Sequence, residues 1–313
     1  IVPDGRSIWT YKEAMVPNTL PKSILVIGSG AIGIEFASFY NDLGVDITVV
    51  EVLDRILPAE DIDISNFALK SFEKQGIKIK TSSMVKSLKT SKGKISVQIE
   101  TMAGSEEVSV EKVILAVGII GNTENLGLEN TSAKVSNGQL VVDRWGATHE
   151  PGLHAIGDLV GAPWLAHKAS HEGIICVERI AGVENVHPLD PSNIPGCTYS
   201  RPQVASVGLT QKLAEDAGYK VRVGHFPFIG NGKAIALGEM DGFVKTVFDA
   251  ITGELLGAHM IGAEVTEMIQ GYTVARTLET TENELLNTVF PHPTLSETMH
   301  ESVLDAFDRA IHI

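Results

Sequence analysis

The sequence is short of cysteine and of positive charge. Only two of its 313 residues are cysteines, Cys176 and Cys197, which are too few for a disulfide framework and too far apart for a Cys-x-x-Cys zinc or redox site. Lysines and arginines number 25 against 39 aspartates and glutamates, a formal net charge of −14, so we expect no nucleic-acid partner. No apolar run is long enough to span a bilayer, and no basic-then-apolar leader opens the sequence, so we expect no membrane partner and a cytoplasmic location.

The content of apolar residues, 43%, and of charged residues, 20%, is typical of a globular protein with about two domains. Short apolar runs typical of parallel strands buried on both faces alternate with stretches typical of helices. The strands are expected at 24–27, 47–50, 77–79 and 113–117, the helices at 34–43 and 63–75, and a hairpin around 91–93. This alternation predicts a doubly wound, Rossmann-like α/β domain over residues 21–139, preceded by a connector over residues 1–20.

The later part of the sequence predicts two smaller domains. Short strands at 140–142 and 153–156 and a helix at 166–181 form a central domain over residues 140–190. Residues 191–313 predict an α+β domain on a mostly antiparallel sheet. Its strands are expected at 204–207, 219–226, 233–237, 243–248 and 255–261, and its helices at 264–278 and 295–311.

A glycine-rich turn follows the first apolar run. In Gly-x-Gly-x-x-Gly the first glycine makes a tight turn, the second admits a pyrophosphate, and the third lets helix and strand pack closely, although such glycines can also serve a turn alone. Glu51 ends the next strand, at about the 20-residue distance expected of an acid that binds a ribose 2′-hydroxyl. Its carboxylate would repel a 2′-phosphate, so we expect NAD and not NADP, although Arg55 lies close in sequence. The predicted cofactor-binding residues are Gly28, Ser29, Gly30, Ala31, Ile32, Gly33 and Glu51.

Two other motifs each permit a structural and a functional interpretation. Asp158 follows the apolar run 153–156 and is either a turn cap or a second nucleotide ligand. His292 and Glu297 precede an amphipathic helix, with Leu295, Met299, Val303, Phe307 and Ile311 expected on one face. Thr294 and Glu297 have the spacing of a capping box, but a carboxylate that orients a histidine is also how a general base is built.

The segment 151–158, followed by residues 164–169, resembles the second flavin motif of the FAD-dependent pyridine-nucleotide–disulfide oxidoreductases. The resemblance implies that the central domain is a remnant of an FAD-binding domain in which Asp158 binds the ribitol. It also implies that a short backbone segment lies beside the flavin ring, namely Leu165, Ala166 and His167.

The string His-Pro-Thr-Leu-Ser-Glu at 292–297 is similar to the C-terminal active-site segment of the dihydrolipoyl dehydrogenases, a branch of the same family. The similarity implies that His292 is the catalytic base and that Glu297 orients it. Residues 121–129 also resemble this branch more than the glutathione or mercuric reductases. Phe290 stands where many relatives carry another histidine, which leaves His292 as the only candidate for the base.

The same resemblance assigns two more residues. It places Gly118 near the nicotinamide and implies that Glu35 pairs with a lysine on the flavin side. Relatives begin with a flavin-binding segment that carries its own glycine motif and a Cys-x-x-x-x-Cys disulfide, and neither occurs in this sequence. We therefore expect the chain to correspond to the C-terminal two thirds of such a protein, to hold an incomplete FAD site, and to be inactive with dihydrolipoamide by itself.

The function implied by the resemblance is oxidation of dihydrolipoamide through a disulfide and FAD, with hydride transfer to NAD⁺. The implied partners are a second copy of the chain, which makes a homodimer joined through the C-terminal domain, and the lipoyl domain of an E2 acyltransferase. Two alternatives stay open, another disulfide reductase of the family, such as a mercuric or glutathione reductase, and a non-catalytic NAD-binding dimeric module.

Overall fold

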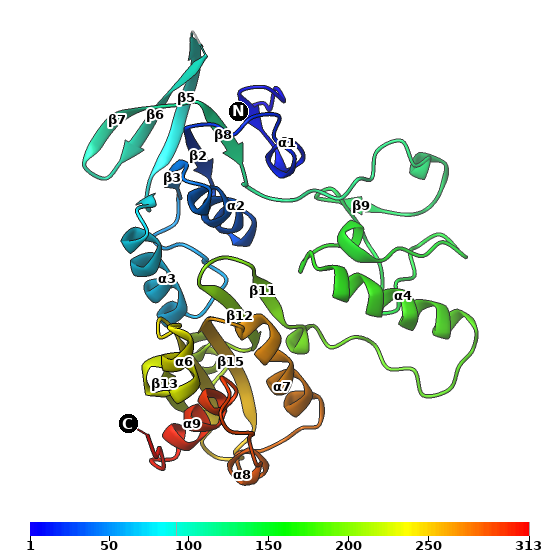
Figure 1. Ribbon diagram of the computed structural model, residues 1–313. Coiled ribbons are helices and arrows are strands. Elements are labelled where there is room, and N and C mark those ends of the chain that lie inside the picture. Colours follow the sequence, from blue (N-terminus) through cyan, green and yellow to red (C-terminus); the bar gives the residue numbers. More distant parts are fainter. Residues whose placement is uncertain (92, 313) are drawn as a thin grey trace. The chain divides into compact units, whose positions relative to one another are not determined.

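The computed structural model describes residues 1–91 and 93–312. The chain forms two compact units, one made of Ile1–Val117 together with Pro195–Ile313 and the other of Gly118–Ile194 (Figure 1). These boundaries differ from the domain boundaries expected after residues 139 and 190, because the chain leaves the parallel sheet directly after its last strand.

A five-stranded parallel sheet forms the first part of the larger unit, in the order β1-β8-β2-β3-β4. Ile24 and Val26 of β2 pack in a cluster with the helices α2 and α3, whereas Leu25 and Ile27 pack on the opposite face. This arrangement confirms the predicted α/β fold. The elements are β1 (Ile8–Trp9), β2 (Ser23–Ile27), β3 (Asp46–Val50), β4 (Lys78–Lys80), β8 (Lys112–Leu115), α2 (Ala31–Asp42) and α3 (Ile62–Lys74).

A three-stranded antiparallel sheet covers that opposite face with Ile95, Val97 and Ile99 of its central strand. Its strands are β5 (Met84–Ser91), β6 (Lys94–Thr101) and β7 (Gly104–Val110). The expected hairpin joins β5 to β6, and Lys92 in its turn lies outside the described residues.

Residues 1–20 contain more structure than the connector that the sequence suggested. β1 pairs with β8 as the edge strand of the parallel sheet, and α1 (Tyr11–Met15) begins with a capping box between Thr10 and Glu13. Ala14 is fully buried beneath Tyr40, whose hydroxyl donates to the Ala14 carbonyl. A two-residue strand and a five-residue helix are too short to produce a recognisable hydrophobic period.

A second five-stranded sheet has the order β11-β12-β15-β14-β13, and all of its strand pairs are antiparallel, where the sequence predicted a mostly antiparallel sheet. The helices α7 and α9 pack against it around Tyr272 and Met299 (Figure 1). The strands are β11 (Gly196–Thr198), β12 (Gln203–Gly208), β13 (Val221–Pro227), β14 (Phe243–Asp249) and β15 (Leu255–Gly262). The helices are α5 (Gln211–Asp216), α6 (Gly232–Leu237), α7 (Val265–Thr277), α8 (Glu282–Asn287) and α9 (Glu297–Ala306).

Two predictions in this sheet region are wrong. Residues 233–237 are not a strand but most of α6, because the Asn231 side chain caps the first turn and Gly238 ends the helix in the left-handed conformation. The last helix ends at Ala306 and does not reach Ile311, which is exposed.

The smaller unit contains α4 (Ala166–Ile180), the strand pair β9 (Val135–Ser136) and β10 (Gln139–Leu140), and the short 3-10 helices η1 (Leu128–Asn130) and η2 (Gly157–Val160). The helix was predicted correctly. The expected strand at 153–156 is wrong, since His154 makes only an isolated bridge with Ala147. Within the described ranges, no helix combines the length and the apolar composition that crossing a bilayer demands.

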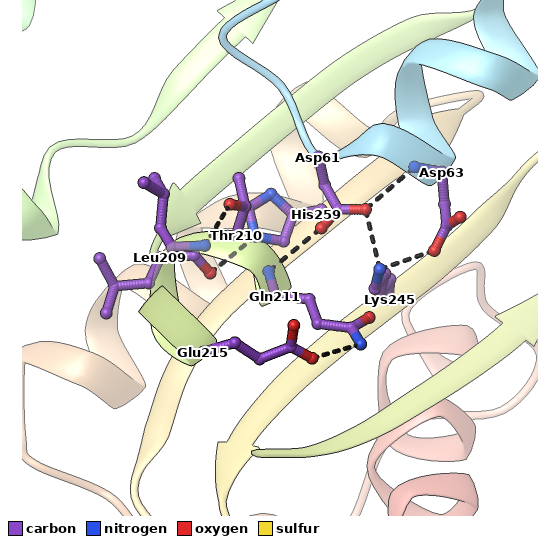
Figure 2. A network of polar contacts seen from close by, with 9 residues as sticks. Asp61, Asp63, Leu209, Thr210, Gln211, Glu215, Lys245 and His259 are labelled. Carbon is purple, nitrogen blue, oxygen red and sulfur yellow. Dashed lines mark hydrogen bonds and ion pairs between the residues drawn. The ribbon is translucent and has the colours of Figure 1, made fainter. Parts of the chain in front are cut away.

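Within the larger unit, a buried ion pair joins α3 to β14 (Figure 2). The Lys245 ammonium lies 2.8 Å from Asp61 and 2.6 Å from Asp63. Asp61 also caps the N-terminus of α3 and accepts a hydrogen bond from the Gln211 amide. This polar network connects the parallel sheet's helix layer to the antiparallel sheet.

Candidate active site

The glycine turn between β2 and α2 is held by two close backbone approaches. Gly28 has a φ of +98°, and a Cβ atom there would lie 2.3 Å from the Ala116 carbonyl oxygen. A Cβ atom at Gly33 would lie 2.1 Å from the Gly28 carbonyl oxygen. Any side chain at Gly28 or Gly33 would therefore disrupt the packing of α2 on the sheet.

Gly30 differs from both, since a Cβ atom there would have nothing within 4 Å. It is the N-cap of α2 and, lacking a side chain, leaves the first turn without a side-chain cap. The next two residues, Ala31 and Ile32, are exposed. Open space in front of uncapped amides at a helix N-terminus fits a pyrophosphate, as the sequence predicted for this glycine.

Glu51 follows β3 and is buried with its carboxylate turned to the glycine turn. One oxygen accepts hydrogen bonds from the Ser29 amide at 2.8 Å and the Ser29 hydroxyl at 2.7 Å, and the other accepts from the Leu53 amide at 2.9 Å. A carboxylate has about four acceptor positions, so one more donor can be accommodated. Arg55 donates to the Pro58 carbonyl. The oriented, charged Glu51 fits a ribose hydroxyl and disfavours a phosphate.

Glu35 lies on α2, where its carboxylate accepts a hydrogen bond of 2.8 Å from the Tyr199 amide. Burial raises the pKa of Glu35, although that hydrogen bond partly opposes the effect. The contact connects α2 to the segment that follows β11. The lysine partner implied by the resemblance stays a prediction.

The smaller unit presents the residues expected to bind flavin around one turn. Asp158, in η2, is exposed, and Leu165, Ala166 and His167 form the start of α4, with Ala166 and His167 exposed. Gly118, with a φ of +137°, is the first residue of this unit.

Lys168 and Glu172 fix that turn to α4. The buried Lys168 ammonium lies 3.0 Å from the Glu172 carboxylate and donates to the Gly161 carbonyl. Glu172 in turn accepts a hydrogen bond of 2.7 Å from the Gly157 amide. Sequence reasoning gave these two residues no role, although their four-residue spacing on a helix was a usable signal.

His292 and Glu297 are brought together at the start of α9. The His292 Nδ1 atom lies 2.9 Å from Glu297 Oε1, while 78% of the His292 side chain is exposed. The contact to a carboxylate requires a proton on Nδ1, which leaves Nε2 with a free lone pair. The pair can thus accept a proton at Nε2 and stabilise the resulting imidazolium.

Glu297 makes contacts that belong to each of the two alternatives that the sequence left open. Its second oxygen accepts a hydrogen bond of 2.9 Å from the Thr294 amide, whereas the Thr294 hydroxyl donates to the Pro291 carbonyl. Only half of the capping box is therefore formed. Burial raises the pKa of Glu297, but the Thr294 amide, His292 and the nearby His312 imidazole together hold that pKa below its usual value.

Sequence reasoning missed two other features of this region. Asn231 donates a hydrogen bond of 3.0 Å to the Thr294 carbonyl and so holds the loop of His292. Glu301 contacts His312 at 2.7 Å. The four-residue spacing of Glu297 and Glu301 was visible in the sequence, but the return of His312 to α9 is a non-local contact without a sequence signal.

In the described part of the chain, the remaining histidine, cysteine and acidic side chains form neither a metal site nor a disulfide. No group of three or more histidine, cysteine, aspartate or glutamate side chains there is arranged to hold a metal ion. Cys176 and Cys197 are free thiols in different units. Burial raises the pKa of both thiols, which lowers their reactivity as thiolates.

Residues 3–173 match the family model described as pyridine nucleotide-disulphide oxidoreductase, and residues 194–303 match the dimerisation domain of that family. The chain is 57% identical over 313 residues to a dihydrolipoyl dehydrogenase of Rhizobium etli, covering 100% of this chain and 65% of the relative. It is also 57% identical over 312 residues to a dihydrolipoyl dehydrogenase of Zymomonas mobilis, covering 99% of this chain and 66% of that relative. The chain thus spans less than two thirds of the length of these relatives.

Solved structures share the fold. LpdA from Mycobacterium tuberculosis is similar with a TM-score of 0.88 and 30% identity, over 96% of this chain and 65% of that chain. The flavoprotein disulfide reductase RclA from Escherichia coli also has a TM-score of 0.88, at 24% identity, over 97% of this chain and 70% of that chain. At that identity the likeness to RclA concerns the fold alone.

Proposed function

Because the chain belongs to the pyridine nucleotide-disulphide oxidoreductase family, we propose that it supplies the NAD-binding and dimerisation parts of a dihydrolipoyl dehydrogenase. One observation carries the proposal, the 2.9 Å contact between His292 Nδ1 and Glu297 on an otherwise exposed imidazole. It is the arrangement needed to remove a proton from a thiol at the protein surface.

Gly30, the uncapped start of α2 and Glu51 would hold NAD⁺. The first-turn amides of α2 bind the pyrophosphate, and the remaining acceptor position of Glu51 binds a hydroxyl of the adenosine ribose. In the smaller unit, Asp158 and the backbone of Leu165–His167 would contact FAD. When bound, FAD carries electrons from a disulfide to the nicotinamide, which receives them as hydride.

His292 would take the proton of a dihydrolipoamide thiol at Nε2, since Nδ1 already donates to Glu297. Proton transfer converts the pair into imidazolium and carboxylate, which attract each other at short range. Asn231 and the Thr294 amide bond keep the loop and the carboxylate in place throughout.

We further propose a homodimer in which His292 serves a disulfide on the other copy, a lipoyl domain of an E2 acyltransferase as the bound substrate, and a cytoplasmic location. The match of residues 194–303 to the dimerisation domain supports the first of these. The high exposure of His292 supports access from outside its own unit. Both cysteines of this chain, Cys176 and Cys197, are free thiols, and their spacing is not that of the Cys-x-x-x-x-Cys disulfide.

The test uses a chimera that joins this chain to the N-terminal third of the Rhizobium etli relative. We expect the chimera to form NADH from dihydrolipoamide and NAD⁺, and the 313-residue chain alone to form none and to bind FAD weakly. His292→Gln in the chimera should lower kcat by a factor of about 100 or more, the usual contribution of a general base. His149→Gln, at another exposed histidine, is the control and should leave activity unchanged.

Three results would contradict the proposal. They are a His292→Gln chimera that keeps most of its activity, a chimera that prefers NADPH, and turnover of dihydrolipoamide by the chain alone. A preference for NADPH would favour another disulfide reductase of the family.

A further inference from the structure

A second carboxylate–imidazole pair lies beside the first. Glu301 follows Glu297 by one turn of α9, and its Oε1 atom lies 2.7 Å from Nδ1 of His312. The other oxygen of Glu301 accepts a hydrogen bond of 3.0 Å from the Ile311 amide. Only 7% of the Glu301 side chain is exposed, against 61% for His312. The tail of the chain thus folds back to place an imidazole on a buried carboxylate.

Both pairs line one small hollow, which we call the two-histidine hollow. It is lined by His292, Glu297, Glu301 and His312, together with Phe226, Gly230, Asn231 and Gly232. Among these lining residues only the two histidines and the two glutamates titrate. Charged or titratable groups on the same or adjoining elements include Arg222, His225, Lys233, His300, Asp305, Asp308 and Arg309. Of these, His300 contacts the Leu286 carbonyl, and Asp305 binds the His225 amide.

The two glutamates oppose each other electrostatically. Carboxylates four residues apart on a helix are neighbours and repel when both are ionised. A buried carboxylate is also costly unless a partner balances its charge. Each imidazole contacts one of the glutamates, so each carboxylate has one partner that can balance its charge.

We propose that His312, held by Glu301, is a positioning residue that sets the pH range over which His292 accepts a proton. The effect on catalysis rests on the proposed function, whereas the effect on the charge of the two-histidine hollow does not. In support, the His312 imidazole is one of the groups that hold the pKa of Glu297 down and so keep it ionised toward His292.

The experiment is an NMR titration of the His292 ring in the 313-residue chain with isotope-labelled histidine. His312→Ala leaves the Glu301 charge unbalanced and should raise the pKa of His292 by about half a pH unit. Glu301→Gln removes that charge and should lower the pKa of His292 by a similar amount. The double variant should fall between the two.

His312 and Glu301 contact each other, so a purely structural role would change the pKa of His292 in the same direction in both variants. Asp308→Asn removes a charge near the end of α9 from a residue that does not line the hollow, and it should move the pKa of His292 less than either variant. Equal values in the wild type and both single variants, or changes in the same direction, would overturn the proposal.

The chimera separates this inference from the proposed function. If both hold, the acidic limb of the kcat/KM pH profile with dihydrolipoamide moves toward higher pH in His312→Ala and toward lower pH in Glu301→Gln. NMR changes of the expected signs in a chimera without dihydrolipoamide activity would support the tuning and refute the function. An active chimera in which neither variant changes the pKa of His292 would support the function and refute the tuning.

Discussion

Gly30 and Gly33 belong to the same motif but are required for different reasons. An added Cβ atom meets a backbone oxygen at 2.1 Å in Gly33 and nothing within 4 Å in Gly30. We expect Gly33→Ala to destabilise the chain by about 1–3 kcal/mol, as overpacking does. Gly30→Ala, whose φ of −65° suits alanine, should unfold like the wild type but bind NAD⁺ at least about tenfold more weakly. Urea unfolding and calorimetric NAD⁺ titration measure the two effects, and a destabilised Gly30→Ala would contradict this division.

His259 predicts a pH dependence of stability. It is completely buried, its Nε2 atom lies 3.0 Å from the Leu209 carbonyl, and its Nδ1 atom has no hydrogen-bond partner within the described residues (Figure 2). Burial lowers the pKa of His259 below its ordinary 6.5, so the unfolded chain binds this proton first as the pH falls. The contribution to stability is therefore complete above pH 6.5 and is lost progressively below it.

The measurement compares the wild type with His259→Gln, which keeps a donor for Leu209 but does not titrate. The free energy of unfolding in urea should fall faster for the wild type between pH 7 and pH 5, by up to about 1.4 kcal/mol per pH unit. His225, whose pKa burial also lowers, contributes equally to both proteins. Parallel curves for the two would show that His259 does not titrate differently in the folded chain.

At the level of elements, α6 shows how a local cap decides a structure. The side-chain oxygen of Asn231 accepts a hydrogen bond of 2.9 Å from the Ala234 amide, while the side-chain NH₂ group of Asn231 donates to the Thr294 carbonyl. We expect Asn231→Ala to cost about 1–2 kcal/mol of unfolding free energy, because it removes a cap from a buried helix start. Asn231→Asp keeps the oxygen that caps α6 but loses the amide group that donates to Thr294. It should therefore be more stable than Asn231→Ala, while the loop of His292 still lacks this hydrogen bond.

The chimera activity distinguishes the two roles of Asn231. With Asn231→Asp, kcat should fall because the His292 loop loses its anchor, while the midpoint of urea unfolding stays closer to that of the wild type than to that of Asn231→Ala. Full activity in Asn231→Asp would show that the loop does not need this hydrogen bond.

Elements with a long, regular hydrophobic period could be predicted from the sequence, and short or non-locally paired ones could not. β2, α2, β3, α3, α4 and α7 follow from local periodicity and end signals. Residues 233–237 end in a short continuous apolar run that suits a strand equally well, so only the Asn231 cap and Gly238 distinguish the helix. Residues 153–156 are as apolar as a strand, but their only strand-like pairing is the isolated bridge from His154 to Ala147. The sequence alone does not show whether a partner strand is available.

The same distinction holds within the site. The glycine turn and Glu51 follow from spacing along one βαβ unit, because the hydrogen bonds between Ser29 and Glu51 and the packing of Gly33 on Gly28 lie within it. That Glu297 uses one oxygen for His292 and the other for Thr294 depends on the loop conformation. That Glu301 meets His312 depends on the path of the chain after α9. Spacing alone therefore left the cap and the base as alternatives, whereas in the structure Glu297 contacts His292 and forms half of the capping box at the same time.

Across the larger unit, the ion pair between Lys245 and Asp61 connects the helix layer of the parallel sheet to the five-stranded antiparallel sheet. Both side chains are 1% exposed, whereas Asp63, the second partner of Lys245, is 50% exposed. Burial raises the pKa of Asp61, but the hydrogen bonds from Lys245 and the Asp63 amide and the nearby His259 hold it below its usual value. The charge at this junction therefore depends on Lys245.

We expect Lys245→Met to destabilise the chain by about 3–5 kcal/mol, because it leaves the Asp61 carboxylate buried without its cation. Adding Asp61→Asn to that variant removes the uncompensated charge and should restore much of the loss, since a neutral pair of similar size is tolerated in a buried position. Asp63→Asn takes a carboxylate from the same lysine at an exposed position and should cost no more than about 1 kcal/mol. Urea unfolding followed by fluorescence and by circular dichroism gives all four values. Because the pair joins α3 to β14, the two probes should report a single unfolding transition in the wild type. A Lys245→Met chain that unfolds in two steps would show that this contact couples the sheets. A Lys245→Met chain that loses less unfolding free energy than Asp63→Asn would show that it does not.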